Sequence, residues 1–196
     1  MRNLILILIV FFSGNLGAQI LLEDLSKTFK KAEDVQSYAL VNADNFETTT
    51  FYKTKNDLSI YQFSSGFLLK DSLVIADLHP DLTTILGGTI ENKSSNRLYF
   101  TDENLKSIYT YSFDLKAKKA DSLARFEMPL NEYVTQIFEH KNAMYVFTIS
   151  KDESWVRVYA FKNKTQPIVQ TYLLDAFGIQ TVEGGQLGFK EVMRTS

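Results

Sequence analysis

The pattern of apolar and polar positions along this chain repeats at a spacing of 48 residues. Three six-residue segments carry the repeat, and they begin at Ser59, Ser107 and Trp155. Units of about 40 to 50 residues that contain short strands are typical of β-propeller blades. Such a unit cannot bury its own faces, so neighbouring units must stack on one another. The pattern therefore predicts an architecture of stacked β-repeats.

Shorter matches on either side of these segments extend each unit to four strands. Residues 96–100 of the second copy resemble residues 142–146 of the third, with two extra residues in the following turn of the third copy. Residues 71–73 of the first copy resemble residues 121–123 of the second. Polar turns separate the segments, and each segment is long enough for one strand. We predict an all-β fold of repeated four-stranded antiparallel blades: about three β-propeller-type blades in an incomplete ring, after a short N-terminal helix.

Alternation along the third strand of each unit predicts one bulky face and one slim face. In the third copy Tyr159 and Phe161 point one way, whereas Val156 and Val158 point the other. We expect the bulky face of one blade to pack against the slim face of its neighbour, as the side chains of packed sheets interdigitate. The second copy has the same two sets: Tyr109, Tyr111 and Phe113 on one face, and Ile108, Thr110 and Ser112 on the other.

These patterns divide the chain into a leader, a helix and the repeats. The predicted parts are a signal peptide at residues 1–18, a lead-in helix at 19–35, and β-propeller-like repeats at 36–196, namely about 36–80, 81–130, 131–175 and a partial 176–196.

The N-terminus has the features of a secretory signal. Arg2 precedes nine apolar residues, and small residues then lead to an expected cleavage between Ala18 and Gln19. Nine residues are too few to span a bilayer, which needs about 20. We expect a secreted or periplasmic protein that does not span the membrane after signal removal. The alternative is a short buried N-terminal helix in a cytosolic protein.

Residues beyond the leader add a helix and a glycine-containing tail. Leu22, Leu25 and Phe29 fall on one face of a predicted helix at residues 23–33. The tail beyond Phe177 is either an unfinished fourth unit or a frayed end. The chain is the front part of a longer protein, a subunit that assembles with other chains, or an open stack, and we favour the first.

Composition and motifs argue against several classes of function. The chain has 21 basic and 23 acidic residues, so its mildly acidic surface does not favour a nucleic-acid partner. It has no cysteine, which excludes a bacterial lipoprotein signal, a disulfide framework and a thiolate metal site. Its two histidines, His79 and His140, are expected in surface turns. Because no known catalytic motif occurs, we predict a non-catalytic protein without a cofactor or metal.

The candidate ligand-binding residues lie in one recurring turn. Asp102 and Glu103 occupy the turn between the second and third strands, and Asp152 and Glu153 occupy the same turn one repeat later. A ring of carboxylates could bind cations or hydroxyl-rich ligands, but acidic residues also stabilise tight turns, and we favour the turn interpretation. Trp155, which begins the following strand, could stack on a sugar. The expected partner is a protein or a glycan, or another copy through an exposed blade face.

Certain motifs resemble a known group of proteins. The leader ending in Ala18-Gln19, the Asn-x-[Leu/Met]-Tyr-[Phe/Val] strand and the Tyr-x-Phe strand resemble secreted β-propeller-like repeat proteins of Bacteroidota-type bacteria. The resemblance covers about residues 35–175. It implies a propeller-like fold and an exported location, and it carries no catalytic residues.

A second resemblance gives an alternative function. A signal peptide, an amphipathic helix and about ten strands are similar to periplasmic lipoprotein carriers, whose half-barrel encloses acyl chains. Leu22, Leu25 and Phe29 would then line the lipid cavity. Because a 48-residue repeat is not expected of that fold, we place a β-repeat binding or scaffold module first. Gly87-Gly88 is expected to mark a bend or bulge in a strand.

Overall fold

The computed structural model describes residues 35–92, 95–121, 123–162 and 166–174. The predicted signal peptide, almost all of the lead-in helix and the partial fourth repeat lie outside these ranges. The regular elements within these ranges are β-strands. The same ranges contain no helix that is long and apolar enough to cross a membrane. The chain divides into two compact units between Pro80 and Asp81.

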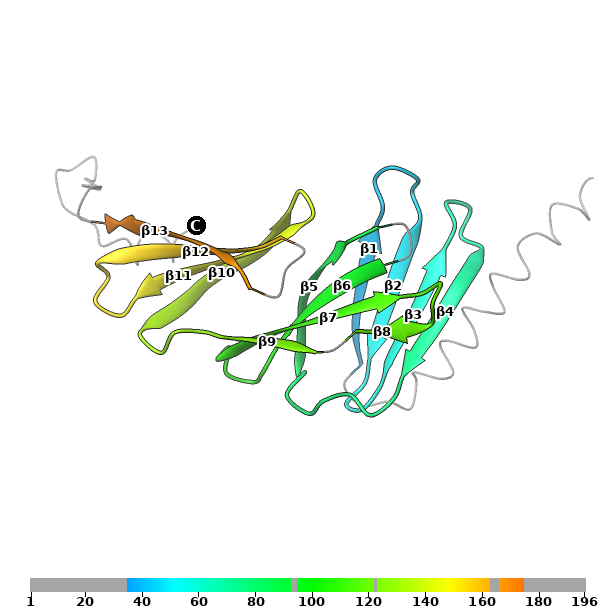
Figure 1. Ribbon diagram of the computed structural model, residues 1–196, viewed down its shortest axis with the longest axis horizontal. Coiled ribbons are helices and arrows are strands. Elements are labelled where there is room, and N and C mark those ends of the chain that lie inside the picture. The colour runs from blue at the N-terminus through cyan, green and yellow to red at the C-terminus, as the bar shows by residue number, and fades with distance from the viewer. Residues whose placement is uncertain (1–34, 93–94, 122, 163–165, 175–196) are drawn as a thin grey trace, which may run out of the picture. The chain divides into compact units, whose positions relative to one another are not determined.

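The first unit contains one antiparallel sheet, sheet A, whose strands follow one another in order (Figure 1). Phe51, Leu58 and Ile60 lie on one face and are fully buried. Tyr52 and Tyr61 lie on the other face, are partly exposed, and contact each other edge to face with their ring centroids 6.0 Å apart. The strands are β1 (Gln36–Val41), β2 (Thr48–Lys53), β3 (Leu58–Phe63) and β4 (Leu69–Ile75).

The second unit contains two such sheets, which we call sheet B and sheet C. In sheet B the last position is divided between two short strands that both pair with the third strand. Sheet B consists of β5 (Thr84–Ile90), β6 (Ser95–Thr101), β7 (Ser107–Asp114), β8 (Lys119–Ala120) and β9 (Ala124–Glu127). Sheet C consists of β10 (Glu132–His140), β11 (Ala143–Ser150), β12 (Trp155–Phe161) and β13 (Ile168–Leu173).

This topology confirms the predicted all-β fold of antiparallel four-stranded repeats. The described residues supply three sheets, whereas closed propellers have at least four blades. The described residues therefore do not complete a ring. Their strands are hydrogen-bonded within three separate sheets. A half-barrel needs one continuous sheet, so the topology does not fit the lipid-carrier alternative.

Strand pairing shows that the 48-residue spacing extends to the second strands of sheets B and C. Thr101 pairs with Ile108 in sheet B, and Ile149 pairs with Val156 in sheet C. The number of residues between the two paired positions is therefore the same in both hairpins. The turn of the third copy contains no extra residues. The predicted match of residues 142–146 to the second strand is therefore wrong by two positions. Because a shift of two keeps every side chain on the same face, it left the predicted faces unchanged.

The first strands of sheets B and C each contain an irregularity at the same place. The register shifts between Ile85 and Gly87 in β5, and between Val134 and Gln136 in β10. Such a shift inserts an extra residue and bends the strand. The bulge expected at Gly87-Gly88 is thereby confirmed.

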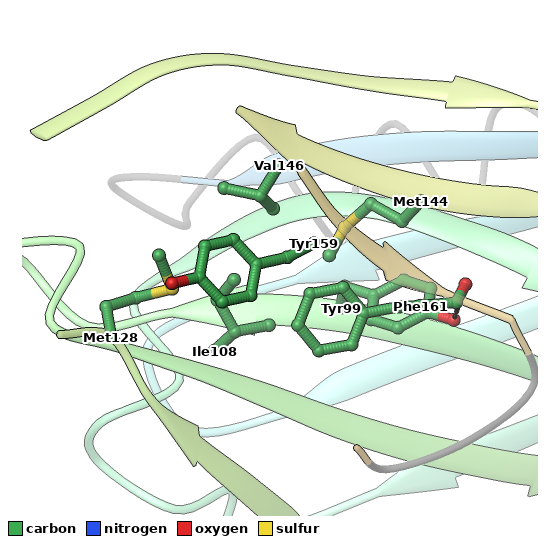
Figure 2. Packing of buried hydrophobic residues seen from close by; sticks show 7 residues of the cluster. All are labelled: Tyr99, Ile108, Met128, Met144, Val146, Tyr159 and Phe161. Carbon is green, nitrogen blue, oxygen red and sulfur yellow. Dashed lines mark hydrogen bonds between the residues drawn. The ribbon is translucent and has the colours of Figure 1, made fainter. Parts of the chain in front are cut away.

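Sheet C places its bulky face on the slim face of sheet B. The Tyr99 hydroxyl donates a hydrogen bond to the Phe161 carbonyl at 3.3 Å, and the two rings meet edge to face at 5.8 Å. Ile108 lies in the same buried cluster (Figure 2). This packing confirms the predicted contact of a bulky face with a slim one. The cluster consists of Tyr99, Ile108, Met128, Met144, Val146, Tyr159 and Phe161.

Polar side chains from the hairpin between β10 and β11 bind the free edge of β5. The Glu139 carboxylate accepts the Gly88 N–H at 2.6 Å, and the Asn142 amide oxygen accepts the Ile90 N–H at 2.7 Å. A Cβ atom at Gly87 would collide with the end of the Glu139 side chain, so a larger residue there would displace this carboxylate. These bonds occupy backbone groups that an edge strand otherwise leaves open.

The stacking of sheets B and C predicts the effect of truncating Ile108. Ile108→Ala should lower the free energy of unfolding by about 2 to 4 kcal/mol, because it opens a cavity between the sheets. Urea denaturation followed by fluorescence measures this change. Leu130→Ala is the control, since Leu130 is 81% exposed and its truncation should cost little. Equal effects of the two variants would contradict the stacking.

Candidate functional site

The structure places Asp102 and Glu103 in the turn between β6 and β7, the second and third strands of sheet B. The Asp102 carboxylate accepts the backbone N–H of Lys106 at 2.8 Å and that of Asn104 at 3.2 Å. Glu103 is exposed. The Asp102 carboxylate thus closes its own turn, as aspartate does at such positions.

Asp152 and Glu153 lie in the corresponding turn of sheet C, between β11 and β12. The Asp152 Oδ1 atom accepts the Ser154 hydroxyl at 2.9 Å. Hydrogen bonds with Ser150 and Ser154 hold the pKa of Asp152 below its usual value, because they favour the ionised carboxylate. Glu153 has a φ of 58° and donates its N–H to the Ser150 carbonyl at 2.9 Å.

The two acidic pairs, Asp102-Glu103 and Asp152-Glu153, make hydrogen bonds within their own turns, as expected of acidic residues that stabilise a turn. The carboxylates of Asp102 and Asp152 each bond to groups of their own turn. Among the described residues, no group of three or more His, Asp or Glu side chains could hold a metal ion. Ligand binding by these four residues stays a prediction.

Trp155 contacts a charged network that the sequence did not reveal. The Arg157 guanidinium lies 4.1 Å from the centroid of the Trp155 ring, a cation–π contact. The same guanidinium donates to the Glu132 Oε1 atom at 2.6 Å. The Glu132 side chain is 1% exposed, whereas that of Arg157 is 32% exposed. Trp155 thus already contacts a side chain of its own sheet. Glu132 is a buried carboxylate that is paired with Arg157.

Both oxygens of the Glu132 carboxylate accept hydrogen bonds. The Tyr159 hydroxyl lies 2.8 Å from each carboxylate oxygen, and the Thr148 hydroxyl donates to Oε2. Burial, together with the hydrogen bond to Glu132, raises the pKa of Tyr159 to about 12. Both carboxylate oxygens of Glu132 are thus engaged in this network. It joins the start of β10 to β11 and β12 and stabilises sheet C.

Sheet B has a similar contact, but two positions earlier in the repeat, because Tyr109 corresponds to Arg157 in the 48-residue register. The Tyr109 hydroxyl donates to the Asp81 Oδ2 atom at 2.9 Å, and Arg125 lies over the Tyr109 ring at 5.8 Å. In both sheets an acidic residue near the first strand accepts a hydrogen bond from a tyrosine on the third strand. The acidic residue is Asp81, before β5, in sheet B and Glu132, at the start of β10, in sheet C. Asp81 and Glu132 are the residues that sequence reasoning missed. The signal was present, because Arg157 on a face predicted to be buried requires an acidic partner.

A groove of about 560 Å³ with mostly apolar walls lies on the other face of sheet C. The Phe138 ring stacks on Tyr145 and tilts against Phe147, each at 5.4 Å between centroids. His140, predicted to lie in a surface turn, is the last residue of β10 and lines this groove. The residues that line this groove, the sheet C groove, are Phe138, His140, Tyr145, Phe147, Val156, Val158, Gln170, Tyr172 and Leu174.

Comparisons with known proteins leave the function open. No protein family model matches the chain, and no curated protein matches it. One similar solved structure is the β-propeller domain of Nup133 from Vanderwaltozyma polyspora, at 14% identity and a TM-score of 0.29. The match covers 71% of this chain and 47% of that chain, so this chain spans about half the length of that structure. A likeness this low carries no argument, and the fold rests on the strands themselves.

The buried position of Glu132 predicts a large effect of its removal. Glu132→Ala should lower the free energy of unfolding by about 3 kcal/mol, because Arg157 and Tyr159 lose a buried partner. Glu127→Ala is the matched control, since the Arg125–Glu127 ion pair is exposed and should contribute less than about 1 kcal/mol. Chemical denaturation of both variants measures the difference. A change no larger for Glu132 than for Glu127 would show that the network is not stabilising.

The raised pKa of Tyr159 predicts a loss of stability in alkaline solution. The unfolded chain releases the phenol proton near pH 10, whereas the folded chain holds it to about pH 12. The contribution of Tyr159 is therefore complete below pH 10 and declines as pH rises toward 12. The loss should reach at most about 2 kcal/mol, because solvent near Arg157 screens the network. Unfolding curves between pH 8 and about 11.5 measure it, and Tyr159→Phe should show a flatter dependence on pH.

Proposed function

We propose that this chain is a non-catalytic β-repeat binding or scaffold module, and that its binding surface is the sheet C groove. The observation that carries this proposal is the equivalence of two surfaces. Tyr99 and Ile108 of sheet B are buried beneath sheet C. By the 48-residue register, Phe147 and Val156 are the same positions in sheet C, and they line the groove. The groove is thus a stacking surface like that of sheet B.

The chemistry of the groove favours a protein surface over a glycan. Stacked and tilted rings form one wall, and valines from β12 contribute to the lining. A sugar site combines an aromatic platform with several directed polar groups. Here His140, Gln170 and the tyrosine hydroxyls are the polar groups of the lining. A fitting partner presents bulky apolar side chains on a sheet, as Tyr159 and Phe161 do to sheet B. The partner of this chemistry that the proposal names is a second copy of this chain.

Export is part of the same proposal. The charged Arg2, the apolar run after it and the small residues up to Ala18 support a signal peptide. The resemblance to secreted repeat proteins supports the same location. A module of this kind would act in the periplasm or outside the cell, by holding partners together through stacked sheets.

The proposal predicts that the purified chain associates through the sheet C groove. Sedimentation velocity over a range of concentrations should show association in the unaltered chain. Val158→Glu should weaken it by about tenfold or more, because a carboxylate on the groove wall would be buried without a partner. Val169→Glu is the matched control, since Val169 is 46% exposed and lies on the opposite face of the same sheet. Its association should be unchanged.

Two results would overturn the proposal. One is a chain that stays monomeric at every concentration, and the other is association that Val158→Glu does not weaken. A glycan array tests the other class of ligand, a sugar. Binding of a glycan that Tyr172→Ala abolishes would replace the protein partner with a sugar.

A further inference from the structure

Sheet A has one buried face and one face that is partly open. Strand pairing places the open set of side chains opposite one another, since Thr50 pairs with Tyr61 and Ser59 pairs with Val74. The rings of Tyr52 and Tyr61 are partly exposed, and Val74 is 61% exposed. We call this surface the sheet A open face. Its large apolar and aromatic residues are Val41, Tyr52, Tyr61, Phe63, Leu69 and Val74.

The sheet A open face carries no charge at its paired positions. The residues that strand pairing places on it include no Asp, Glu, Lys or Arg. Lys70, at the bulge in β4, is bound to the Glu47 carboxylate. An antiparallel sheet that meets water normally presents polar side chains on its outer face. An uncharged face with aromatic and aliphatic side chains is instead typical of a docking surface.

The 48-residue register relates this face to the sheet C groove. Phe63 lies two repeats before Tyr159, which packs with Ile108 in the cluster between sheets B and C. Val156, one repeat after Ile108, lines the sheet C groove. The sheet A open face thus carries the position that packs on a slim face, and the groove carries the position that receives it.

We propose that the sheet A open face of one copy of this chain docks in the sheet C groove of a second copy, in the way that sheet C packs on sheet B. This inference rests on the proposed function, because it names the surface of the partner copy that fills the groove. Each copy has one surface of each kind, so the contact is heterologous and joins copies head to tail.

The two surfaces meet without burying an unpaired charge, which would be costly. The residues that line the groove include no Asp, Glu, Lys or Arg. On the bulky face of sheet C, Arg157 requires Glu132 as its partner. Sheet A has Tyr61 two repeats before Arg157. Tyr61 and Phe63 therefore offer the groove two aromatic rings where sheet C offers sheet B a paired guanidinium and a ring.

Two single variants and their mixture test the inference by sedimentation velocity. Phe63→Glu places a carboxylate on the sheet A open face and should weaken association by about tenfold or more, as Val158→Glu does from the groove side. An equimolar mixture of the two variants should associate again, because the first keeps its groove and the second keeps its open face. The mixed complex should contain two chains and grow no further.

Leu130→Glu is the matched control for the added charge. Leu130 is 81% exposed and lies outside both surfaces, so association should be unchanged. Val74→Glu should act as Phe63→Glu does, alone and in the mixture, and it replaces Phe63→Glu if that variant does not fold. Urea denaturation shows which variants fold.

The outcomes separate this inference from the proposed function. Association that neither Phe63→Glu nor Val74→Glu weakens would overturn the inference, whereas the proposed function would stand if Val158→Glu still weakened it. Variants that stay monomeric both alone and in the mixture would also overturn the inference, because a head-to-tail contact must be restored by mixing. A chain that never associates would overturn both.

Discussion

The stacking of a bulky sheet face on a slim one is the contact on which the second unit depends. Each sheet alone exposes aromatic and aliphatic side chains on both faces, and burial of such side chains contributes about 1.5 to 3 kcal/mol each. Tyr159 and Phe161 of sheet C reach this burial because they pack in one cluster with Ile108 and Tyr99 of sheet B. The same asymmetry repeats along the chain. Sheet C covers the slim face of sheet B, and the slim face of sheet C in turn lines the groove.

Polar contacts at the margins of this stack fix its register. Glu139 and Asn142 bind the backbone of β5, and Glu132 joins three strands of sheet C through Tyr159, Thr148 and Arg157. Apolar packing tolerates small sliding movements, whereas directed bonds to a strand edge do not. The interior of the stack thus provides most of the stability, and its margins provide the alignment.

The open groove follows from the same arrangement. Phe147 and Val156 repeat the positions of Tyr99 and Ile108, and in the described residues no fourth sheet covers them. An exposed apolar surface of this kind is typical of docking sites. The proposed binding module is a consequence of this repeated surface.

The sequence by itself determined the strands, their order and their two faces, because a 48-residue period and alternation are local properties that need no knowledge of neighbours. It also indicated the bulge at Gly87-Gly88. Only the tertiary structure revealed the partner of Arg157, because Glu132 is 25 residues away and becomes its neighbour through strand pairing. The same holds for the groove, whose walls come from β10, β11, β12 and β13. Periodicity identifies which face of a strand is apolar, but which sheet covers that face depends on contacts between segments far apart in the chain.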